Sequence, residues 1–316
     1  MNRFESLKNE LNNFIIEYCQ TNRKVLNTAN KDLVKGGGKR LRPILLIQSA
    51  RFGDYDHGRI IKIAAAVEML HMATLVHDDI IDDARLRRGN KSAQKKFGKN
   101  IAVFVGDFLL AKTYIIFSKY LTRDNLNRLN KTVKLICEGE IDQFQKRYDY
   151  NISIVDYLKR IRRKTALLFA FSTYIGASES GMVGNALQHL YKFGMELGMT
   201  FQIQDDLLDF IGNESKVGKK VGQDMAAGIY TLPLICLINN KTYHKQVYRI
   251  LKKEQLDDND IKIITEYIVK SGVLDQSRKI AGKFMDKALY HLEQLSEVEA
   301  KDNLKYIIDR QLKREQ

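Results

Sequence analysis

Proline, tryptophan and cysteine are scarce in this chain of 316 residues, which contains two prolines, no tryptophan and three cysteines. Because proline interrupts helices, the long stretches without it favour helical structure, and we expect an all-α fold. Cys19, Cys137 and Cys236 are odd in number, far apart and without a C-x-x-C spacing. They therefore predict reduced thiols rather than a disulfide framework.

Long apolar runs and a secretory signal are also lacking. No stretch approaches the ~18 consecutive apolar residues of a membrane-spanning helix, and the first five residues lack the apolar core of a signal peptide. We therefore expect a cytoplasmic protein. The formal net charge is +14, which is compatible with an anionic membrane surface, an acidic partner or phosphorylated small molecules. Much of this charge lies in scattered lysines that serve solubility, and we expect no nucleic-acid binding.

Two clusters of aspartates stand out against this background. Both have the spacing D-D-x-x-D after an apolar stretch, with Asp78, Asp79 and Asp82 in the first and Asp205, Asp206 and Asp209 in the second. On a helix the first and last aspartate of each cluster share one face. Crowded carboxylates repel one another and are the hard oxygen ligands that Mg²⁺ prefers. A single acidic helix end is usually a solvated surface, but two copies favour a metal-binding function.

Basic loops containing glycine follow both clusters, and a third lies near the start of the chain. They cover residues 35–43 (KGGGKRLRP), 84–91 (ARLRRGNK) and 217–224 (VGKKVGQD). Glycine lets the backbone approach a ligand closely. Arg40 and Arg42 could offer planar forks to phosphate oxygens, and Lys35 and Lys39 could supply point charges. The alternative is a plain basic loop before a helix whose first turn holds Pro43.

Apolar periodicity predicts long helices around these motifs. We expect helices over residues 4–18, 44–52, 59–82, 101–117, 121–145, 156–174 and 187–210, with a break of small residues over 176–184. His71 lies two turns before Asp78 on nearly the same face, where it is either a hydrogen-bonding group of the core or a ligand-binding residue.

This combination of residues fits diphosphate chemistry better than hydrolysis. No Ser-His-Asp or Cys-His set is persuasively placed, and no P-loop or dinucleotide-binding glycine motif is present. Carboxylates repel a diphosphate, but bridging Mg²⁺ ions reverse that sign. The loop at 39–42, with Arg88 and His71, could hold a second anionic substrate without metal. We therefore expect a site for two diphosphates in an apolar helical bundle.

The sequence resembles the trans-isoprenyl diphosphate synthases, or polyprenyl synthetases. The matching segments run in family order from about residue 35 to 235: GGKRLRP (37–43), EMLH (68–71), DDIID (78–82), RRG (87–89), GD (106–107), KT (164–165), FQIQDD (201–206), GK (218–219) and TLP (231–233). The resemblance implies one domain over residues 1–316, with C-terminal helices over 236–316. It also implies an isoprenoid-synthase bundle around a deep apolar cavity, with both aspartate motifs facing each other across its mouth.

The resemblance also implies Mg²⁺-dependent, head-to-tail condensation of isopentenyl diphosphate with an allylic diphosphate. The residues it implies as metal ligands are Asp78, Asp79, Asp82 and Asp205, supported by Asp206 and Asp209. The residues implied to contact the allylic diphosphate are Arg87, Lys164 and Lys219. Those implied to hold isopentenyl diphosphate are Lys39, Arg42, His71 and Arg88. Thr165 and Gln202 would place their oxygens near the developing allylic cation, and the released diphosphate is the expected base for the final proton.

Product length is implied by the residues four and five positions before Asp78. Short-chain relatives carry a bulky side chain there, whereas this chain has Thr74 and Ala73. We therefore expect a long all-trans product, hexaprenyl to decaprenyl and best matched by heptaprenyl, built on farnesyl or geranylgeranyl diphosphate for quinone side chains such as that of menaquinone. Ile229 stands where many relatives carry a lysine two residues before Thr-Leu-Pro, which implies that one diphosphate contact is missing.

The resemblance leaves the partner and three other functions open. We expect a homodimer or a heterodimer with a small non-catalytic subunit, and peripheral membrane association for product release. The alternatives are a shorter-chain farnesyl or geranylgeranyl synthase, a class I terpene cyclase and a non-catalytic regulatory subunit. The all-aspartate second motif disfavours the cyclase, and two intact motifs disfavour the regulatory subunit.

Overall fold

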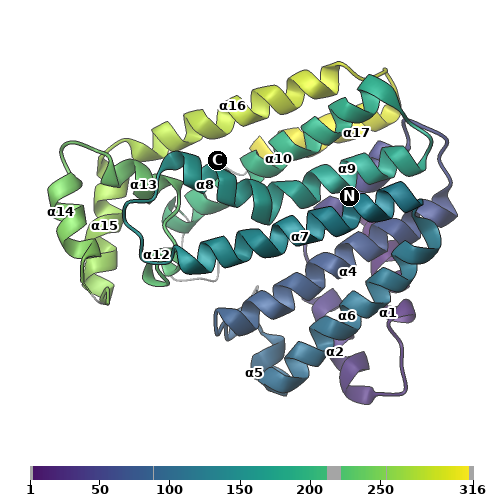
Figure 1. The fold of residues 1–316 in the computed structure, drawn as a ribbon, viewed down its shortest axis with the longest axis horizontal. Coiled ribbons are helices and arrows are strands. Elements are labelled where there is room, and N and C mark those ends of the chain that lie inside the picture. Colours follow the sequence, from purple (N-terminus) through teal and green to yellow (C-terminus); the bar gives the residue numbers. More distant parts are fainter. Residues whose placement is uncertain (1–2, 88, 212–221, 254, 313–316) are drawn as a thin grey trace. The chain divides into compact units, whose positions relative to one another are not determined.

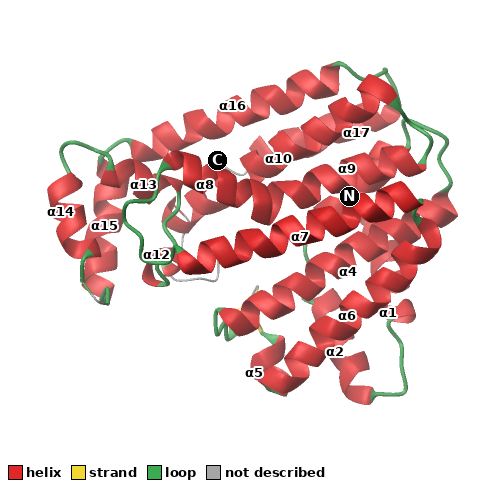
Figure 2. Ribbon diagram, in the orientation of Figure 1, coloured by secondary structure: helices red, strands yellow, loops and turns green. Residues whose placement is uncertain are grey.

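The regular structure of the chain is almost entirely helical in the computed structural model, which describes residues 3–87, 89–211, 222–253 and 255–312 (Figures 1 and 2). The helices are α1 (Glu5–Tyr18), α2 (Lys24–Lys35), α3 (Leu41–Ala50), α4 (His57–Ile81), α5 (Ala93–Phe97), α6 (Lys99–Tyr120), α7 (Arg123–Gln145), α8 (Ile154–Ile161), α9 (Leu167–Glu179), α10 (Gly184–Ile211), α12 (Gln223–Ala226), α13 (Leu232–Ile238), α14 (His244–Leu251), α15 (Asp258–Lys270), α16 (Val273–Glu293) and α17 (Glu299–Leu312). A π-helical segment, η1 (Arg162–Ala166), joins α8 to α9, and strands β1 (Leu86–Arg87) and β2 (Asn90–Lys91) form a small antiparallel hairpin. The predicted all-α fold is confirmed.

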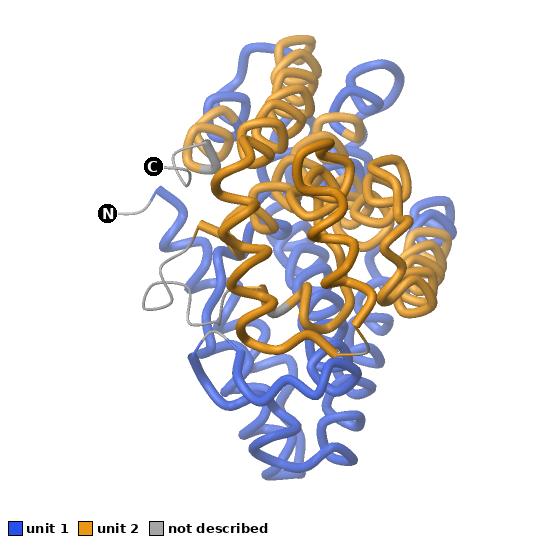
Figure 3. The backbone as a smooth tube through the Cα atoms, turned by 90° about the vertical axis from the view of Figure 1, so that its left-hand side faces the viewer, with its two compact units in different colours: residues 1–129, 172–190, 296–304 blue, residues 130–171, 191–295, 305–316 orange. Residues whose placement is uncertain are grey.

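The chain divides into two compact units, and each is built from separate segments (Figure 3). Unit 1 comprises Met1–Leu129, Ser172–Leu190 and Ser296–Leu304, and unit 2 comprises Asn130–Phe171, Tyr191–Leu295 and Lys305–Gln316. Neither unit is one continuous stretch of sequence. A single domain over residues 1–316 stays a prediction.

Helix α4 is the core helix of unit 1 because apolar side chains occupy nearly all of its faces. Its buried residues include Ile63, Val67 and Met69. Helix α6 packs against it closely at Gly106, where an added Cβ would lie 2.2 Å from the His77 ring. The glycine of the Gly-Asp motif therefore makes room for a neighbouring helix.

Helix α9 shows a similar close approach, and the predicted break begins later than expected, between Glu179 and Gly184. The predicted small-residue break began at Gly176, but α9 continues to Glu179. A Cβ on Gly176 would meet the backbone oxygen of Leu46 at 2.0 Å. This glycine therefore lets α9 pack on α3 inside unit 1, and helix packing, not chain breaking, explains it.

Within the part of the chain that the structure describes, two helices, α4 and α6, are long and apolar enough to cross a membrane by length and composition alone. Consecutive apolar runs did not predict this, because isolated polar residues such as His71 and Asp107 interrupt them. The most apolar stretch of α4 is 72% buried, as in a soluble core, whereas that of α6 is 39% buried. Helix α6 thus exposes an apolar face that includes Phe104 and Ile115.

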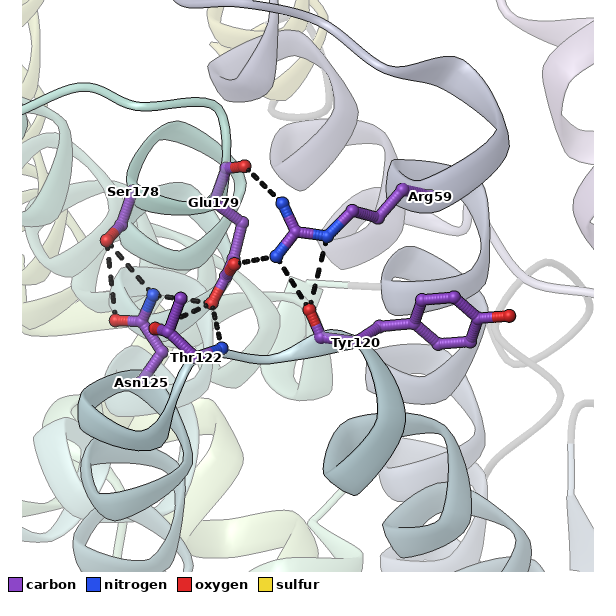
Figure 4. A network of polar contacts seen from close by, with 6 residues as sticks. All are labelled: Arg59, Tyr120, Thr122, Asn125, Ser178 and Glu179. Carbon is purple, nitrogen blue, oxygen red and sulfur yellow. Dashed lines mark hydrogen bonds and ion pairs between the residues drawn. The ribbon is translucent and has the colours of Figure 1, made fainter.

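A polar network holds four helix ends of unit 1 together (Figure 4). The Arg59 guanidinium, at the start of α4, donates to the backbone oxygens of Tyr120 at 2.7 Å and Glu179 at 2.8 Å, and pairs with the Glu179 carboxylate. That carboxylate also accepts from the Thr122 backbone N–H at 2.8 Å and from the Asn125 amide at 2.6 Å. The network therefore ties the end of α9 to the turn between α6 and α7.

Replacing Glu179 with glutamine should lower the free energy of unfolding by about 2 kcal/mol, because Arg59 loses its counter-charge and an amide N–H must face other donors. Chemical denaturation measures this loss. Glu266→Gln is the control, because Glu266 forms an exposed pair with Lys270 at 3.3 Å on one helix and should change stability by less than about 0.5 kcal/mol. Equal losses in both variants would show that the network contributes nothing particular.

Candidate active site

The first aspartate motif lies at the end of α4 and is divided between two faces. Asp78 is half-buried and Asp82 is exposed, whereas Asp79 is buried. The Arg87 guanidinium, from β1, donates to the Asp79 carboxylate at 2.7 Å. The Asp79 backbone oxygen also accepts from the Gln94 amide. Asp78 and Asp82 are therefore the more exposed pair, while Asp79 holds the basic hairpin against the helix.

The predicted phosphate-binding loop is held by one of its own arginines. Arg40 is buried in a left-handed backbone conformation with a φ of 50°. Its guanidinium donates to Glu68 at 2.8 Å, to Asn12 at 2.9 Å and to the backbone oxygen of Val34 at 2.9 Å. Arg40 is thus an internal anchor, and the expectation that it offers a fork to phosphate was wrong. Lys39 is exposed and Arg42 is half-buried on either side of this anchor.

A cavity of about 330 Å³ lies in unit 1 on the face of α4 that carries Glu68, Met72 and Asp79. Lys35, Arg40 and Arg87 also line it. The residues predicted to hold isopentenyl diphosphate, Lys39, Arg42 and His71, are not among the lining residues. The pair predicted to set product length, Ala73 and Thr74, is not among them either. The cavity therefore reaches two of the residues predicted for the metal and the allylic diphosphate, Asp79 and Arg87.

The second aspartate motif lies near the end of α10 in unit 2 and is divided in the same way. Asp205 is exposed and Asp209 is half-buried, whereas Asp206 is buried. The Asp206 carboxylate accepts from the Tyr157 hydroxyl at 2.7 Å and from the Gln202 amide at 2.8 Å. Burial raises the pKa of Asp206 to about 7, although both hydrogen bonds act to lower it. As in the first motif, the second aspartate turns inward.

The predicted pair Lys164-Thr165 lies in η1, the π-helical segment, which periodicity did not predict. Such single turns are frequent at functional sites because they displace side chains from the α-helical register. The Lys164 ammonium contacts Glu140 at 2.8 Å. The Thr165 hydroxyl donates to the Gln202 side-chain oxygen at 2.6 Å. The structure therefore brings together two of the residues predicted to face the allylic cation.

Several contacts at the site carried no sequence signal. Tyr157 and Glu140 belong to no motif, and only the packing of unit 2 places them beside Asp206 and Lys164. His77 lies 3.4 Å from Asp107, which gives the Gly-Asp motif a second role beside helix packing. Two predicted ligand-binding residues, Arg88 and Lys219, lie outside the described residues.

The carboxylates of the two aspartate motifs suit Mg²⁺ that is bound together with the phosphates of a substrate. Among the residues that the structure describes, no group of three or more metal-binding side chains lies close enough to hold an ion. Mg²⁺ usually keeps several waters and binds one or two carboxylates together with substrate phosphates. Asp78 with Asp82, and Asp205 with Asp209, each offer such a pair at i and i+4. The mutual placement of the two motifs stays a prediction.

Known proteins resemble this chain over almost its whole length. The polyprenyl synthetase family model matches residues 23–268. Component 2 of heptaprenyl diphosphate synthase from Geobacillus stearothermophilus is 36% identical over 280 residues, which are 89% of this chain and 87% of that protein.

Solved structures extend this likeness to the fold. Heptaprenyl diphosphate synthase from Staphylococcus aureus has a TM-score of 0.93 at 31% identity and covers 97% of both chains. A polyprenyl synthase from Caulobacter crescentus, crystallised with calcium and isoprenyl diphosphate, has a TM-score of 0.91 at 32% identity, covering 98% of this chain and 94% of that one. The chain therefore belongs to the polyprenyl synthetase family and is an all-α prenyltransferase.

Proposed function

We propose that this prenyltransferase condenses isopentenyl diphosphate units head-to-tail onto farnesyl or geranylgeranyl diphosphate in a Mg²⁺-dependent reaction. The observation that carries the proposal is the identical division of the two aspartate motifs. In each motif the second aspartate is buried against protein partners, and the first and fifth are more exposed than it is. A solvated acidic helix end would not require this division twice.

The allylic diphosphate would be held by the more exposed aspartates through Mg²⁺ and by Arg87, Lys164 and Lys219. When bound, Mg²⁺ supplies positive charge that neutralises the departing diphosphate. Arg87 and Lys164 each contact a carboxylate, Asp79 at 2.7 Å and Glu140 at 2.8 Å. These contacts hold both cationic groups in place before a diphosphate arrives, which limits the reorganisation needed during the reaction.

Isopentenyl diphosphate would be held without metal by Lys39, Arg42, His71 and Arg88. Arg40 supports this assignment, because its three internal hydrogen bonds fix the backbone between Lys39 and Arg42. His71 follows one turn after Glu68, the residue that pairs with Arg40. The anchor therefore links the loop to the helix that carries both His71 and the first aspartate motif.

The developing allylic cation would be stabilised by the oxygens of Thr165 and Gln202, while apolar walls exclude water. Departure of the diphosphate breaks the C–O bond of the allylic substrate. The double bond of isopentenyl diphosphate then forms the new C–C bond. The released diphosphate takes the proton, which agrees with the lack of a dedicated base among the motifs.

We propose a heptaprenyl product for a quinone side chain such as that of menaquinone. Support comes from the small residues Ala73 and Thr74, and from relatives named heptaprenyl diphosphate synthase. Thr74 does not extend its hydroxyl outward, because the group donates to the His71 backbone oxygen at 2.8 Å. Neither side chain is large enough to act as a floor for the growing chain.

We propose that the catalytic chain works with a second subunit, either a small non-catalytic protein or another copy of itself. The Geobacillus and Bacillus subtilis relatives are both named component 2, which implies a further component. The exposed apolar face of α6, with Phe104 and Ile115 61% and 56% exposed, is the surface that such a subunit would cover. A cytoplasmic location with peripheral membrane contact suits release of an apolar product.

Incubating the purified chain with Mg²⁺, farnesyl diphosphate and labelled isopentenyl diphosphate tests this function. We expect linear prenyl diphosphates, loss of activity on chelation of the metal, and recovery when Mg²⁺ is restored. Cyclic hydrocarbons would instead identify a terpene cyclase. Inactivity both alone and with a component 1 protein from a relative would identify a regulatory subunit.

A further inference from the structure

A continuous chain of hydrogen bonds runs through unit 2 from Tyr157 to Thr165. The Tyr157 hydroxyl donates to one oxygen of Asp206 at 2.7 Å, and the Gln202 amide N–H donates to the other at 2.8 Å. The Gln202 oxygen then accepts from the Thr165 hydroxyl at 2.6 Å. The chain joins α8, η1 and α10, so that residues 157 and 165 are linked through two residues of α10.

The direction of this chain follows from the chemistry of its members. Both oxygens of Asp206 accept hydrogen bonds, one from the Tyr157 hydroxyl and the other from the Gln202 amide N–H. Gln202 must therefore turn its NH₂ group toward Asp206 and its oxygen toward Thr165. Because that oxygen accepts, the single hydroxyl hydrogen of Thr165 is directed at Gln202. The lone pairs of the Thr165 oxygen are consequently directed away from Gln202.

Burial limits the access of water molecules that could exchange the donor and acceptor roles in this chain of hydrogen bonds. The residues Tyr157, Thr165 and Asp206 are 0%, 5% and 5% exposed. Burial also raises the pKa of the Tyr157 hydroxyl well above its usual value, so the phenol stays protonated and remains a donor. The Arg160 guanidinium lies 5.4 Å from the Tyr157 ring and donates to the Tyr230 backbone oxygen at 2.5 Å. Tyr157 is therefore itself held in place.

We propose that Tyr157 is a positioning residue which, through Asp206 and Gln202, orients the lone pairs of the Thr165 hydroxyl toward the developing allylic cation. This inference rests on the proposed condensation reaction and deepens it. A hydroxyl that could rotate would present its positive hydrogen to the cation in part of the population. A fixed acceptor costs no reorganisation when the charge forms. The second aspartate of this motif thus orients side chains, and the first and fifth remain for metal.

Replacing Tyr157 with phenylalanine tests this role, because the change removes only the donor. We expect kcat to fall by about ten- to hundredfold while the KM values of both diphosphates stay within about twofold. Asp206→Asn keeps the shape of the side chain but removes one acceptor. It should likewise lower kcat and leave the KM values nearly unchanged. The control is Tyr150→Phe. The centroid of the Tyr150 ring lies 4.8 Å from that of Tyr248, elsewhere in unit 2. Thermal unfolding verifies that each variant is folded.

Double variants separate positioning from a purely structural effect. Adding Tyr157→Phe to Thr165→Val should cause no further loss, because no hydroxyl remains to orient. Adding it to Thr165→Ser, which retains the hydroxyl, should again lower kcat about ten- to hundredfold. Equal losses in the Val and Ser backgrounds, or an unchanged kcat in the single variant, would overturn the inference. A wild-type chain that makes no linear prenyl product would overturn the proposed function as well.

Discussion

Replacing Asp82 with asparagine should lower kcat for the proposed condensation by about a thousandfold, because one carboxylate of an exposed pair is lost while the shape of the side chain is retained. Asp82 is exposed and lies one helical turn after Asp78. Its side chain is thus accessible from solvent, unlike that of the buried Asp79. Steady-state kinetics at saturating substrates, repeated over a series of Mg²⁺ concentrations, measure the loss. The Mg²⁺ concentration needed for half-maximal rate should rise as well.

The neighbouring Asp83 supplies a matched control. Asp83 is also exposed, and its carboxylate lies 3.2 Å from the Lys99 ammonium. It falls outside the D-D-x-x-D spacing, so Asp83→Asn should leave kcat and the Mg²⁺ dependence within about twofold of wild type, as expected for a screened surface pair. If Asp82→Asn behaves like Asp83→Asn, the more exposed aspartates do not hold the metal.

The helical framework was predictable because it depends on local pattern. The apolar stripe of α1, the long apolar run of α4 and the glycine-rich break before α3 each lie in consecutive residues. The D-D-x-x-D spacing likewise places its first and last aspartates on one face of any helix. These parts of the site therefore follow from the order of the residues alone.

The division within each motif was not predictable, because it depends on partners from distant segments. Asp79 turns inward toward Arg87 and Asp206 toward Tyr157. Neighbouring residues on a helix differ by about 100° in direction, and only the surrounding helices decide which direction is buried. The resemblance assigned all six aspartates to metal, and the structure buries Asp79 against Arg87 and Asp206 against Tyr157.

The same reasoning explains why Arg40 was misassigned. An arginine beside three glycines looks like a phosphate ligand when only the loop is considered. Its actual partners are Asn12 and Glu68, each 28 residues away in the chain, and burial of a guanidinium requires such partners. The π-helical turn at Lys164 was missed because the segments on both of its sides, α8 and α9, have an ordinary α-helical period. Their apolar pattern gives no sign of the extra residue between them.

Product length should respond to the volume of the side chain at position 73. Ala73 is fully buried on α4, five residues before Asp78, and we expect the growing prenyl chain to pass it. Ala73→Ser should keep the long product, Ala73→Leu should shorten it, and Ala73→Tyr should shorten it further, to geranylgeranyl diphosphate when farnesyl diphosphate is the primer. Liquid chromatography with mass spectrometry of the dephosphorylated products measures the distribution.

A bulky residue elsewhere on the same helix is the necessary control. Leu75 lines the 330 Å³ cavity on another face of α4, where a tyrosine ring has space, so Leu75→Tyr should leave product length unchanged. Tyrosine in a packed site without a cavity would cost about 1–3 kcal/mol of stability. An Ala73→Tyr protein that is both stable and shortened therefore shows that the ring enters the space of the growing chain. A stable variant with an unshortened product would place the floor of the product cavity at other residues.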